Sequence, residues 1–237
     1  MHLQDVARFI HVQELHFDST QEARRFVEKY TVRLFRDVAQ DRATLRLLAF
    51  PDAPAPFVVC KDFFDVPTWY RVSIGRFLIA HEYGAYARLQ GIEGVPQVFG
   101  RPHPAMMLME YLSPGEDLWR YQRGELPPEV LTQLQRLVSA MHQRGVIHLD
   151  IGHDAHGRFG RETNLIWHEE RRRLYIMDPA GALYGLPLPR AIREGLEGHD
   201  ELGIKKIHDF FFPDLEYSAP APLKPWALKL FTKLKKI

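Results

Sequence analysis

The sequence has little cysteine, no long apolar run and almost no net charge, and each shortage excludes a class of protein. Cys60 is the single cysteine in 237 residues, so an internal disulfide framework is excluded and a reducing compartment is favoured. No apolar run reaches the roughly 18–20 residues that cross a bilayer, and the first residues lack the pattern of a signal peptide. The net charge of +1 gives no general reason to bind nucleic acid. We expect a cytoplasmic globular protein without a nucleic-acid partner.

The first 112 residues alternate short apolar runs with turns, as is typical of an antiparallel sheet. The runs "TVRLFRD" and "ATLRLLAF" flank the polar turn "VAQDR" and predict a β-hairpin. A third strand, "FVVCKDF", precedes the helical pattern "IGRFLIAHEYGAYARLQGI". In that pattern one buried face is expected to hold Phe77, Leu78, Tyr83, Tyr86 and Leu89. The strands "GVPQVFG" and "AMMLMEYL" follow. We predict a small antiparallel sheet with one principal helix.

The character of the chain changes near residues 112–118. The segment "PPEVLTQLQRLVSAMHQRG" predicts an amphipathic helix that begins after Pro128 and ends at Gly145. The runs "NLIW" and "RLYIMD" then predict a short hairpin, and a further helix is expected over about 190–211. The second half of the chain should therefore be mostly helical.

The stretch 145–167, "GVIHLDIGHDAHGRFGRETNLIW", concentrates titratable side chains. His148, Asp150, His153, Asp154 and His156 lie within nine residues, and imidazole and carboxylate groups are suitable ligands for zinc, iron or manganese. The spacing matches no metal motif with a clear mechanism, so a His/Asp metal hydrolase is a remote hypothesis. A catalytic loop that carries an insert is the alternative.

In their order along the chain, these parts resemble the protein-kinase-like fold. Lys61 lies near the end of the third strand, Glu82 lies early in the next helix, and "LMEYL" resembles the kinase hinge. "AMHQRGVIHLD" resembles the helix and strand that lead to the catalytic loop, with Asp150 as its aspartate. Asn164 heads "NLIW" like the asparagine of that loop, and "YIMDP" resembles the strand that ends in the metal-binding aspartate, here Asp178.

The resemblance covers about residues 31–180 and implies an α+β, bilobal fold. The N-lobe would be residues 1–112, with a small antiparallel β-sheet and one main helix. The C-lobe would be residues 113–237, reduced and mostly helical. Together they imply a kinase that uses ATP and Mg²⁺.

Phosphoryl transfer depends mostly on positioning and on neutralising phosphate charge, and the resemblance gives each residue a role of that kind. Lys61 would bind the α- and β-phosphates, and Glu82 would hold Lys61 in place. Backbone groups of Glu110 and Leu112 would meet adenine. These residues would form the nucleotide site.

The remaining roles belong to the second half of the chain. Asn164 and Asp178 would hold Mg²⁺, which prefers hard oxygen ligands. Asp150 would accept the proton of the acceptor hydroxyl.

Three departures from the kinase pattern indicate which members of the superfamily the chain resembles. The first turn, "RDVAQDR", contains no glycine, so backbone amides cannot approach phosphates as closely as in a glycine-rich loop. Thirteen residues separate Asp150 from Asn164, where the kinase loop has four. The segment after Asp178, "PAGALYGLPLPR", has no Ala-Pro-Glu element. The chain therefore looks more like compact bacterial members of the superfamily, such as the lipopolysaccharide core (Kdo/heptose) kinases or the RIO-type kinases.

The acceptor remains open, and our first expectation is a sugar on a lipid-linked glycan. In that case the insert between Asp150 and Asn164 would contact the acceptor through His153, His156, Arg158 and Arg161. The alternatives are a compact protein Ser/Thr kinase and a kinase-like binding module with little catalytic power.

The end of the chain, "LKPWALKLFTKLKKI", carries five lysines and no acid. As a helix, residues Trp226–Ile237 would place aromatic and aliphatic side chains opposite the lysines, which is the profile of an interfacial helix on an anionic membrane. Packing of this helix on the protein is an equal alternative. We expect a monomer, and under the first alternative this segment would contact the inner face of the membrane.

Overall fold

The computed structural model describes residues 15–36, 42–50, 57–151 and 163–217. The chain divides into two compact units. The first comprises residues 1–90 and 96–112, and the second comprises residues 91–95 and 113–237. The segment 91–95, which the sequence placed in the N-lobe, therefore groups with the second unit.

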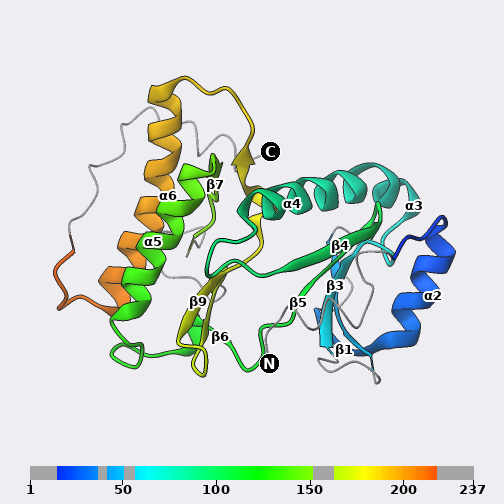
Figure 1. Ribbon diagram of the computed structural model, residues 1–237, viewed down its shortest axis with the longest axis horizontal. Coiled ribbons are helices and arrows are strands. Elements are labelled where there is room, and N and C mark those ends of the chain that lie inside the picture. Colours follow the sequence, from blue (N-terminus) through cyan, green and yellow to red (C-terminus); the bar gives the residue numbers. More distant parts are fainter. Residues whose placement is uncertain (1–14, 37–41, 51–56, 152–162, 218–237) are drawn as a thin grey trace. The chain divides into compact units, whose positions relative to one another are not determined.

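The first unit is built on a five-stranded sheet in which all neighbouring strands are antiparallel (Figure 1). Its strand order is β1-β2-β3-β5-β4. The strands are β1 (Thr31–Arg36), β2 (Thr44–Ala49), β3 (Phe57–Asp62), β4 (Val98–His103) and β5 (Met106–Glu110). The predicted hairpin is the β1–β2 pair, so alternation of apolar and polar residues located these strands correctly.

Helix α2 (Thr20–Tyr30) packs against β2 and β4. It begins where the sequence predicts, because the Ser19 side chain accepts a hydrogen bond from the Glu22 N–H at 3.1 Å. At its other end the Thr31 hydroxyl donates to the Val27 carbonyl at 2.7 Å. Ala23 and Val27 are buried and fix this helix to the sheet.

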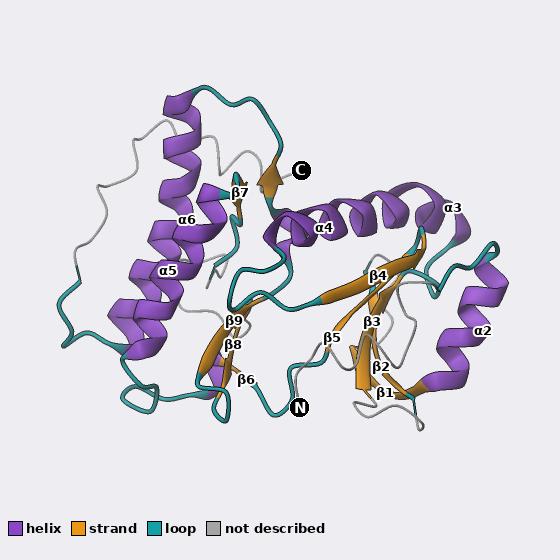
Figure 2. Ribbon diagram, viewed as in Figure 1, coloured by secondary structure: helices purple, strands orange, loops and turns teal. Residues whose placement is uncertain are grey.

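A second helical segment begins earlier than predicted. Helix α3 (Thr68–Tyr70) continues through a π-helical turn (Arg71–Gly75) into α4 (Arg76–Leu89), which lies along the sheet and contacts β4 and β5 (Figure 2). The close approach of Gly75 to Phe63 explains the glycine, because a Cβ there would lie 2.9 Å from the Phe63 ring. The expected buried position of Phe77 is wrong, since this side chain is 67% exposed.

The second unit centres on two helices, α5 (Glu129–Gln143) and α6 (Arg190–Phe211), which pack together. The buried face of α5 is the predicted apolar stripe, which includes Val130, Leu134, Val138 and Met141. Figure 1 shows the two helices side by side. Both helices lie close to their predicted ranges, between Pro128 and Gly145 for α5 and over about 190–211 for α6.

Short strands complete the second unit. A three-stranded sheet has the order β6-β8-β9, from β6 (Glu116–Asp117), β8 (Leu165–His168) and β9 (Arg173–Ile176). A separate pair joins β7 (Val146–Ile147) to β10 (Leu183–Tyr184). Two 3-10 turns, Leu118–Arg120 and Pro179–Gly181, follow β6 and precede β10. The β8–β9 pair is the hairpin that "NLIW" and "RLYIMD" predict.

Two predicted features lie outside the described residues: the side chains of the insert, His153, His156, Arg158 and Arg161, and the segment Trp226–Ile237. Within the described ranges, no helix is both long and apolar enough to span a bilayer.

Candidate functional site

The first unit brings Lys61 and Glu82 together. Lys61 lies on β3 between Leu45 of β2 and Met107 of β5, so its position is fixed by pairing on both sides. Helix α4 presents Glu82, and the Lys61 Nζ atom lies 2.6 Å from the Glu82 Oε2 atom. Only 2% of the Glu82 side chain is exposed. A carboxylate buried this deeply needs a charged partner, and Lys61 provides it.

The residue after Lys61 forms a second buried ion pair, on the other face of β3 because side chains alternate along a strand. The Asp62 carboxylate accepts hydrogen bonds from the Arg46 Nε and the Phe64 N–H, each at 2.9 Å. Arg46 also pairs with Asp65. Burial raises the pKa of Asp62, and the Arg46 guanidinium opposes that shift. This pair ties β2 to β3 and to the turn after β3.

Cys60 lies beside the same carboxylate. Its Sγ atom is 3.9 Å from an Asp62 oxygen, and its side chain is fully buried. Burial raises the pKa of the thiol well above its usual value, and the neighbouring Asp62 carboxylate adds to the shift. A protonated, buried thiol is a poor nucleophile, so Cys60 belongs to the core.

Glu110 and Leu112 end the first unit at the position of the predicted hinge. The Glu110 N–H donates to the Gln97 carbonyl at 2.8 Å, and its side chain accepts from the Gln97 N–H at 3.1 Å. These two bonds fix the end of β5. In the described part of the chain, nothing hydrogen-bonds to the Leu112 backbone N–H.

The second unit brings Asp150 and Asn164 together despite the thirteen residues between them. The Asn164 Nδ2 group donates to the Asp150 carbonyl at 2.9 Å and to its Oδ2 atom at 3.0 Å. The Met177 N–H donates to the Asn164 carbonyl at 2.7 Å, directly before Asp178. Hydrogen bonds thus connect Asn164 to Asp150 on one side and to Met177, the neighbour of Asp178, on the other.

The backbone next to the carboxylates is left-handed at two non-glycine residues. Leu149, just before Asp150, has φ 65°, and Asp178 itself has φ 53°. This conformation costs about 1–2 kcal/mol for a residue with a Cβ, and it persists only where surrounding bonds enforce it. The loop around Asp150 must therefore be held by other groups.

Asp200 of α6 holds that loop. This carboxylate is fully buried and accepts from the Leu149 N–H at 2.7 Å, from the His148 N–H at 2.8 Å and from the His142 ring at 2.9 Å. Sequence reasoning missed Asp200. The signal was present, since its carboxylate lies on the apolar stripe of α6 between Leu196 and Ile204.

His148 links the same loop to the strand before Asp178. Its Nε2 group donates to the Met177 carbonyl at 2.9 Å. This nitrogen therefore has a structural role. In the described part of the chain, no group of three or more His, Cys, Asp or Glu side chains is arranged to hold a metal ion. The metal-hydrolase hypothesis gains no support from His148 and Asp150.

The donor set of the loop fits Mg²⁺ better than it fits zinc. Asn164 uses its amide nitrogen for Asp150, so its amide oxygen is left as a hard donor, and Asp178 contributes a carboxylate. Magnesium in phosphotransferases is held by one or two such groups, with phosphate and water completing the shell. The two residues are therefore suitable for the predicted ion.

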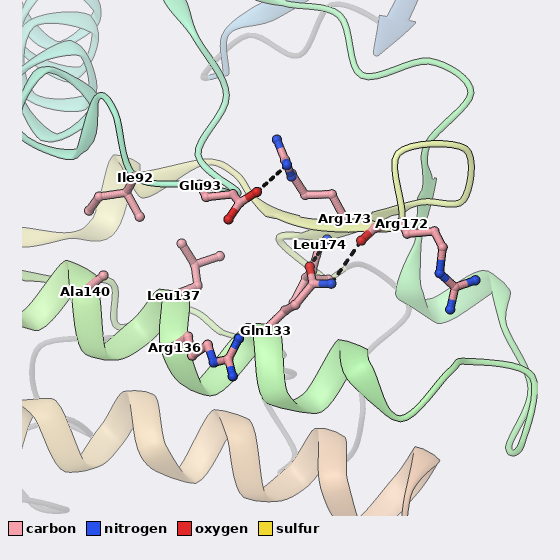
Figure 3. Close-up of a pocket in the computed structure, with 9 residues that line it drawn as sticks. All are labelled: Ile92, Glu93, Gln133, Arg136, Leu137, Ala140, Arg172, Arg173 and Leu174. Carbon is pink, nitrogen blue, oxygen red and sulfur yellow. Dashed lines mark hydrogen bonds and ion pairs between the residues drawn. The ribbon is translucent and has the colours of Figure 1, made fainter.

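A pocket of about 420 Å³ lies elsewhere in the second unit, between α5, β9 and the segment 91–95 (Figure 3). Glu93 pairs with Arg173 across it. The Gln133 side chain donates to the Arg172 carbonyl at 3.0 Å and accepts from the Leu174 N–H at 2.9 Å. None of the predicted site residues lines this pocket. Its polar contacts fasten β9 to α5.

Known proteins resemble the chain in structure and not in sequence. Neither a protein-family model nor a curated protein sequence matches it. The crystal structure of the Rio2 kinase from Chaetomium thermophilum matches with a TM-score of 0.59 at 16% identity, over 89% of this chain and 65% of that chain. The chain has the protein-kinase-like fold. The predicted α+β class, with a small antiparallel sheet and a mostly helical second half, is confirmed.

A second crystal structure of that kinase, in complex with ADP, Mg²⁺ and phosphoaspartate, matches with a TM-score of 0.58 at 16% identity. It covers 89% of this chain and 63% of that chain. The chain thus spans less than two thirds of the length of either structure. At this identity the likeness shows the fold alone, and the specific resemblance to lipopolysaccharide core kinases stays a prediction.

Proposed function

We propose that the protein is an ATP-dependent phosphotransferase that moves the γ-phosphate to a hydroxyl group. The observation that carries the proposal is the buried Lys61–Glu82 ion pair, 2.6 Å long, in a chain with the kinase-like fold. A lysine held by a buried glutamate on a helix is a fixed point charge, and such a charge positions phosphates without further reorganisation.

The other site residues divide the remaining work. The Leu112 N–H and the Glu110 carbonyl would bind adenine. Asn164 and Asp178 would hold Mg²⁺, which neutralises phosphate charge when bound. The use of nucleotide and metal is also supported by the ADP and Mg²⁺ in the Rio2 complex.

Asp150 would orient the acceptor hydroxyl and take its proton. The bond between the γ-phosphorus and the ADP oxygen breaks as the hydroxyl oxygen bonds to that phosphorus. The Asn164 side chain supports this role, because it donates one hydrogen bond to the Asp150 carboxylate, which fixes its direction, and one to the Asp150 backbone carbonyl. The Asp200 carboxylate would act through Leu149 and His148, as a positioning residue.

For the acceptor we propose a sugar of a lipid-linked glycan at the inner face of the membrane. The insert residues His153, His156, Arg158 and Arg161 would contact it, and the basic segment Trp226–Ile237 would bring the protein to the lipid. A protein Ser/Thr acceptor and a kinase-like binding module remain the alternatives.

A second candidate is transfer of the phosphoryl group to an aspartate of the protein itself. The phosphoaspartate in the Rio2 complex favours it, and Asp150 and Asp178 are the candidates in this chain. An acyl phosphate is cleaved by hydroxylamine, whereas a phosphate ester is not. Labelling with γ-³²P-ATP followed by hydroxylamine treatment therefore separates the two products.

A thermal-shift assay with four arms tests the nucleotide site: no addition, ATP alone, Mg²⁺ alone, and both. We expect Tm to rise most with both, because a ligand that binds only the folded state stabilises it by mass action. Asp178→Ala should lose the metal-dependent part of the gain. No response to millimolar ATP with Mg²⁺ would favour the binding-module alternative and count against the phosphotransferase.

Replacing the insert between Asp150 and Asn164 with four residues tests the acceptor assignment. We expect this variant to keep the ATP-dependent shift in Tm and to lose acceptor phosphorylation. Loss of both the Tm shift and acceptor phosphorylation would mean that the insert supports the structure of the loop. The assignment of the insert to the acceptor would then fail, whereas the nucleotide site is tested separately by the thermal shift of the unmodified chain.

A further inference from the structure

The segment that leads into α4 exposes large apolar side chains where a core was expected. Trp69 is 66% exposed and Phe77 is 67% exposed, and Val72 and Ile74 between them are also exposed. These four side chains, together with Arg76, are called here the helix-entry face. They lie on α3, the π-helical turn and the first turn of α4.

The buried side of this segment is already occupied. Gly75 packs on Phe63, with 2.9 Å between the ring and the position of a Cβ. Further along, Ile79 and Glu82 face inward. The packing of α4 on its own sheet therefore makes no use of Trp69 or Phe77. Exposed clusters of large apolar side chains on a folded domain mark a surface that meets a partner.

The charge of the helix-entry face has one sign. The sequence between Asp65 and Glu82 contains no acid and includes Arg71 and Arg76. Arg71 donates only to neutral groups, the Phe64 carbonyl at 3.4 Å and the Thr68 hydroxyl at 3.2 Å. In the described ranges the Arg76 side chain forms no ion pair or hydrogen bond. Two cations therefore flank the aromatic side chains without a neutralising carboxylate.

We propose that the helix-entry face contacts a membrane surface that carries anionic headgroups. Trp and Phe insert at the boundary between headgroups and acyl chains, and neighbouring arginines bind the headgroup phosphates. An aromatic segment without acidic residues, whose arginine side chains have no carboxylate partner in the described ranges, has the chemistry of this boundary. The contact is independent of phosphotransfer, and it is distinct from the segment Trp226–Ile237.

The position of the helix-entry face gives the contact a consequence. Phe77 and Glu82 lie five residues apart on the same helix, and Glu82 is the partner of Lys61. Docking of the face would place the unit that carries this ion pair at the lipid surface.

Sedimentation of the full chain with vesicles tests the proposal. The vesicles are phosphatidylcholine alone or phosphatidylcholine mixed with phosphatidylglycerol. We expect binding to the anionic vesicles, weakened by salt, and a loss of at least about tenfold in affinity for the double variant Trp69→Ser/Phe77→Ser. Arg76→Glu should weaken binding to anionic vesicles by roughly tenfold or more, because it replaces an attraction by a repulsion.

The matched control is Leu186→Ser/Phe210→Ser. These side chains are also exposed, at 55% and 46%, but Phe210 follows Asp209 and precedes Asp214, so an anionic surface should not receive it. We expect this variant to bind vesicles like the unmodified chain. Equal Tm values for both double variants would show that they remain folded.

Because the segment Trp226–Ile237 could also bind lipid, each variant is repeated in a Trp226→Ser/Phe231→Ser background. A loss caused by Trp69→Ser/Phe77→Ser in either background supports the proposal. Unchanged binding in both backgrounds overturns it. Failure of the unmodified chain to bind anionic vesicles, or equal binding to neutral ones, also overturns it and points to a protein partner.

Discussion

Lys61 and Glu82 occupy regular positions on a strand and a helix, whereas Asp150 and Asp178 lie on turns with left-handed backbone. In the first unit, sheet register and one ion pair hold the charged groups. In the second unit, the loop that carries Asp150 is held by residues distant in sequence. The main one is Asp200, whose carboxylate accepts hydrogen bonds from the N–H groups of His148 and Leu149. The first arrangement depends on secondary structure, and the second depends on tertiary contacts that include one buried carboxylate.

The difference has a practical consequence. A strand paired on both sides tolerates the loss of one side chain without changing its register. A strained turn has no such support, because the free energy stored at Leu149 and Asp178 is offset only by the bonds around it. Substitution of a residue that holds the site should therefore lower the free energy of unfolding more in the second unit than in the first.

Asp200→Ala should have the largest effect on stability. It leaves the buried N–H of His148 and the partly buried N–H of Leu149 without an acceptor, and it removes the partner of His142. We expect the free energy of unfolding to fall by roughly 3–5 kcal/mol, measured by urea denaturation.

The control for Asp200 is Asp209→Ala on the same helix. Asp209 is exposed and pairs with Lys205, which lowers the pKa of its carboxyl. Its loss should cost no more than about 0.5 kcal/mol. A cost below about 1 kcal/mol for Asp200→Ala would contradict the role given to that residue.

Lys61→Met and Arg46→Met compare the two buried ion pairs of the first unit. Each leaves a buried carboxylate, Glu82 or Asp62, without its cation, and we expect each to cost about 2–3 kcal/mol as that carboxylate takes up a proton. Only Lys61→Met should abolish the rise in Tm with ATP and Mg²⁺. Equal loss of the ATP response in both variants would mean that the response depends on stability and not on Lys61.

Asn164→Ala should have a smaller effect on stability. Its two hydrogen bonds to Asp150 are exposed, so we expect a cost of about 1 kcal/mol. The concentration of Mg²⁺ that gives half of the maximal activity should rise at least about tenfold. An unchanged Mg²⁺ requirement would remove Asn164 from the metal site.

The smallest effect concerns pH and His103 in the first unit. Burial lowers the pKa of His103, and the nearby Arg76 and Arg71 guanidinium groups and His16 lower it further. Its Nδ1 atom accepts from the Ala105 N–H at 3.1 Å, and protonation would break this bond. The unfolded chain takes up a proton near the ordinary value of about 6.5, before the folded chain does. Stability should therefore fall as pH drops from about 6.5 toward the lowered folded pKa.

Chemical denaturation at several pH values measures this effect. His103→Gln should flatten the dependence in that range, because glutamine does not titrate. The same slope in both proteins would assign the dependence to other groups.

The sequence predicts elements whose pattern is local. Alternation located the β1–β2 hairpin, the run "FVVCKDF" located β3 and hence the place of Lys61, and helical spacing located α5. Phe77 was placed wrongly, because an apolar residue at helical spacing is core only if its side of the helix faces the sheet. Gly75 and Ile79 determine that side, and a π-helical turn shifts the spacing.

The supports of the second unit could not be predicted in the same way. Nothing local connects Asp200 to Leu149, which lies 51 residues earlier. The left-handed backbone at Leu149 is equally invisible, since leucine rarely adopts it, and aspartate, which adopts it more often, does not by itself predict it at Asp178. The Asp200 contacts and the left-handed residues are both consequences of the tertiary fold, in which α6 packs against the loop that carries Asp150.

ATP turnover by the unmodified chain and by Asp178→Ala, at equal concentrations of protein and Mg²⁺, tests the central claim most directly. The phosphotransferase account predicts that the unmodified chain turns over ATP at least about 100-fold faster in the presence of its acceptor, because the variant loses a ligand of the ion that neutralises phosphate charge. Equal rates for the two proteins would contradict it.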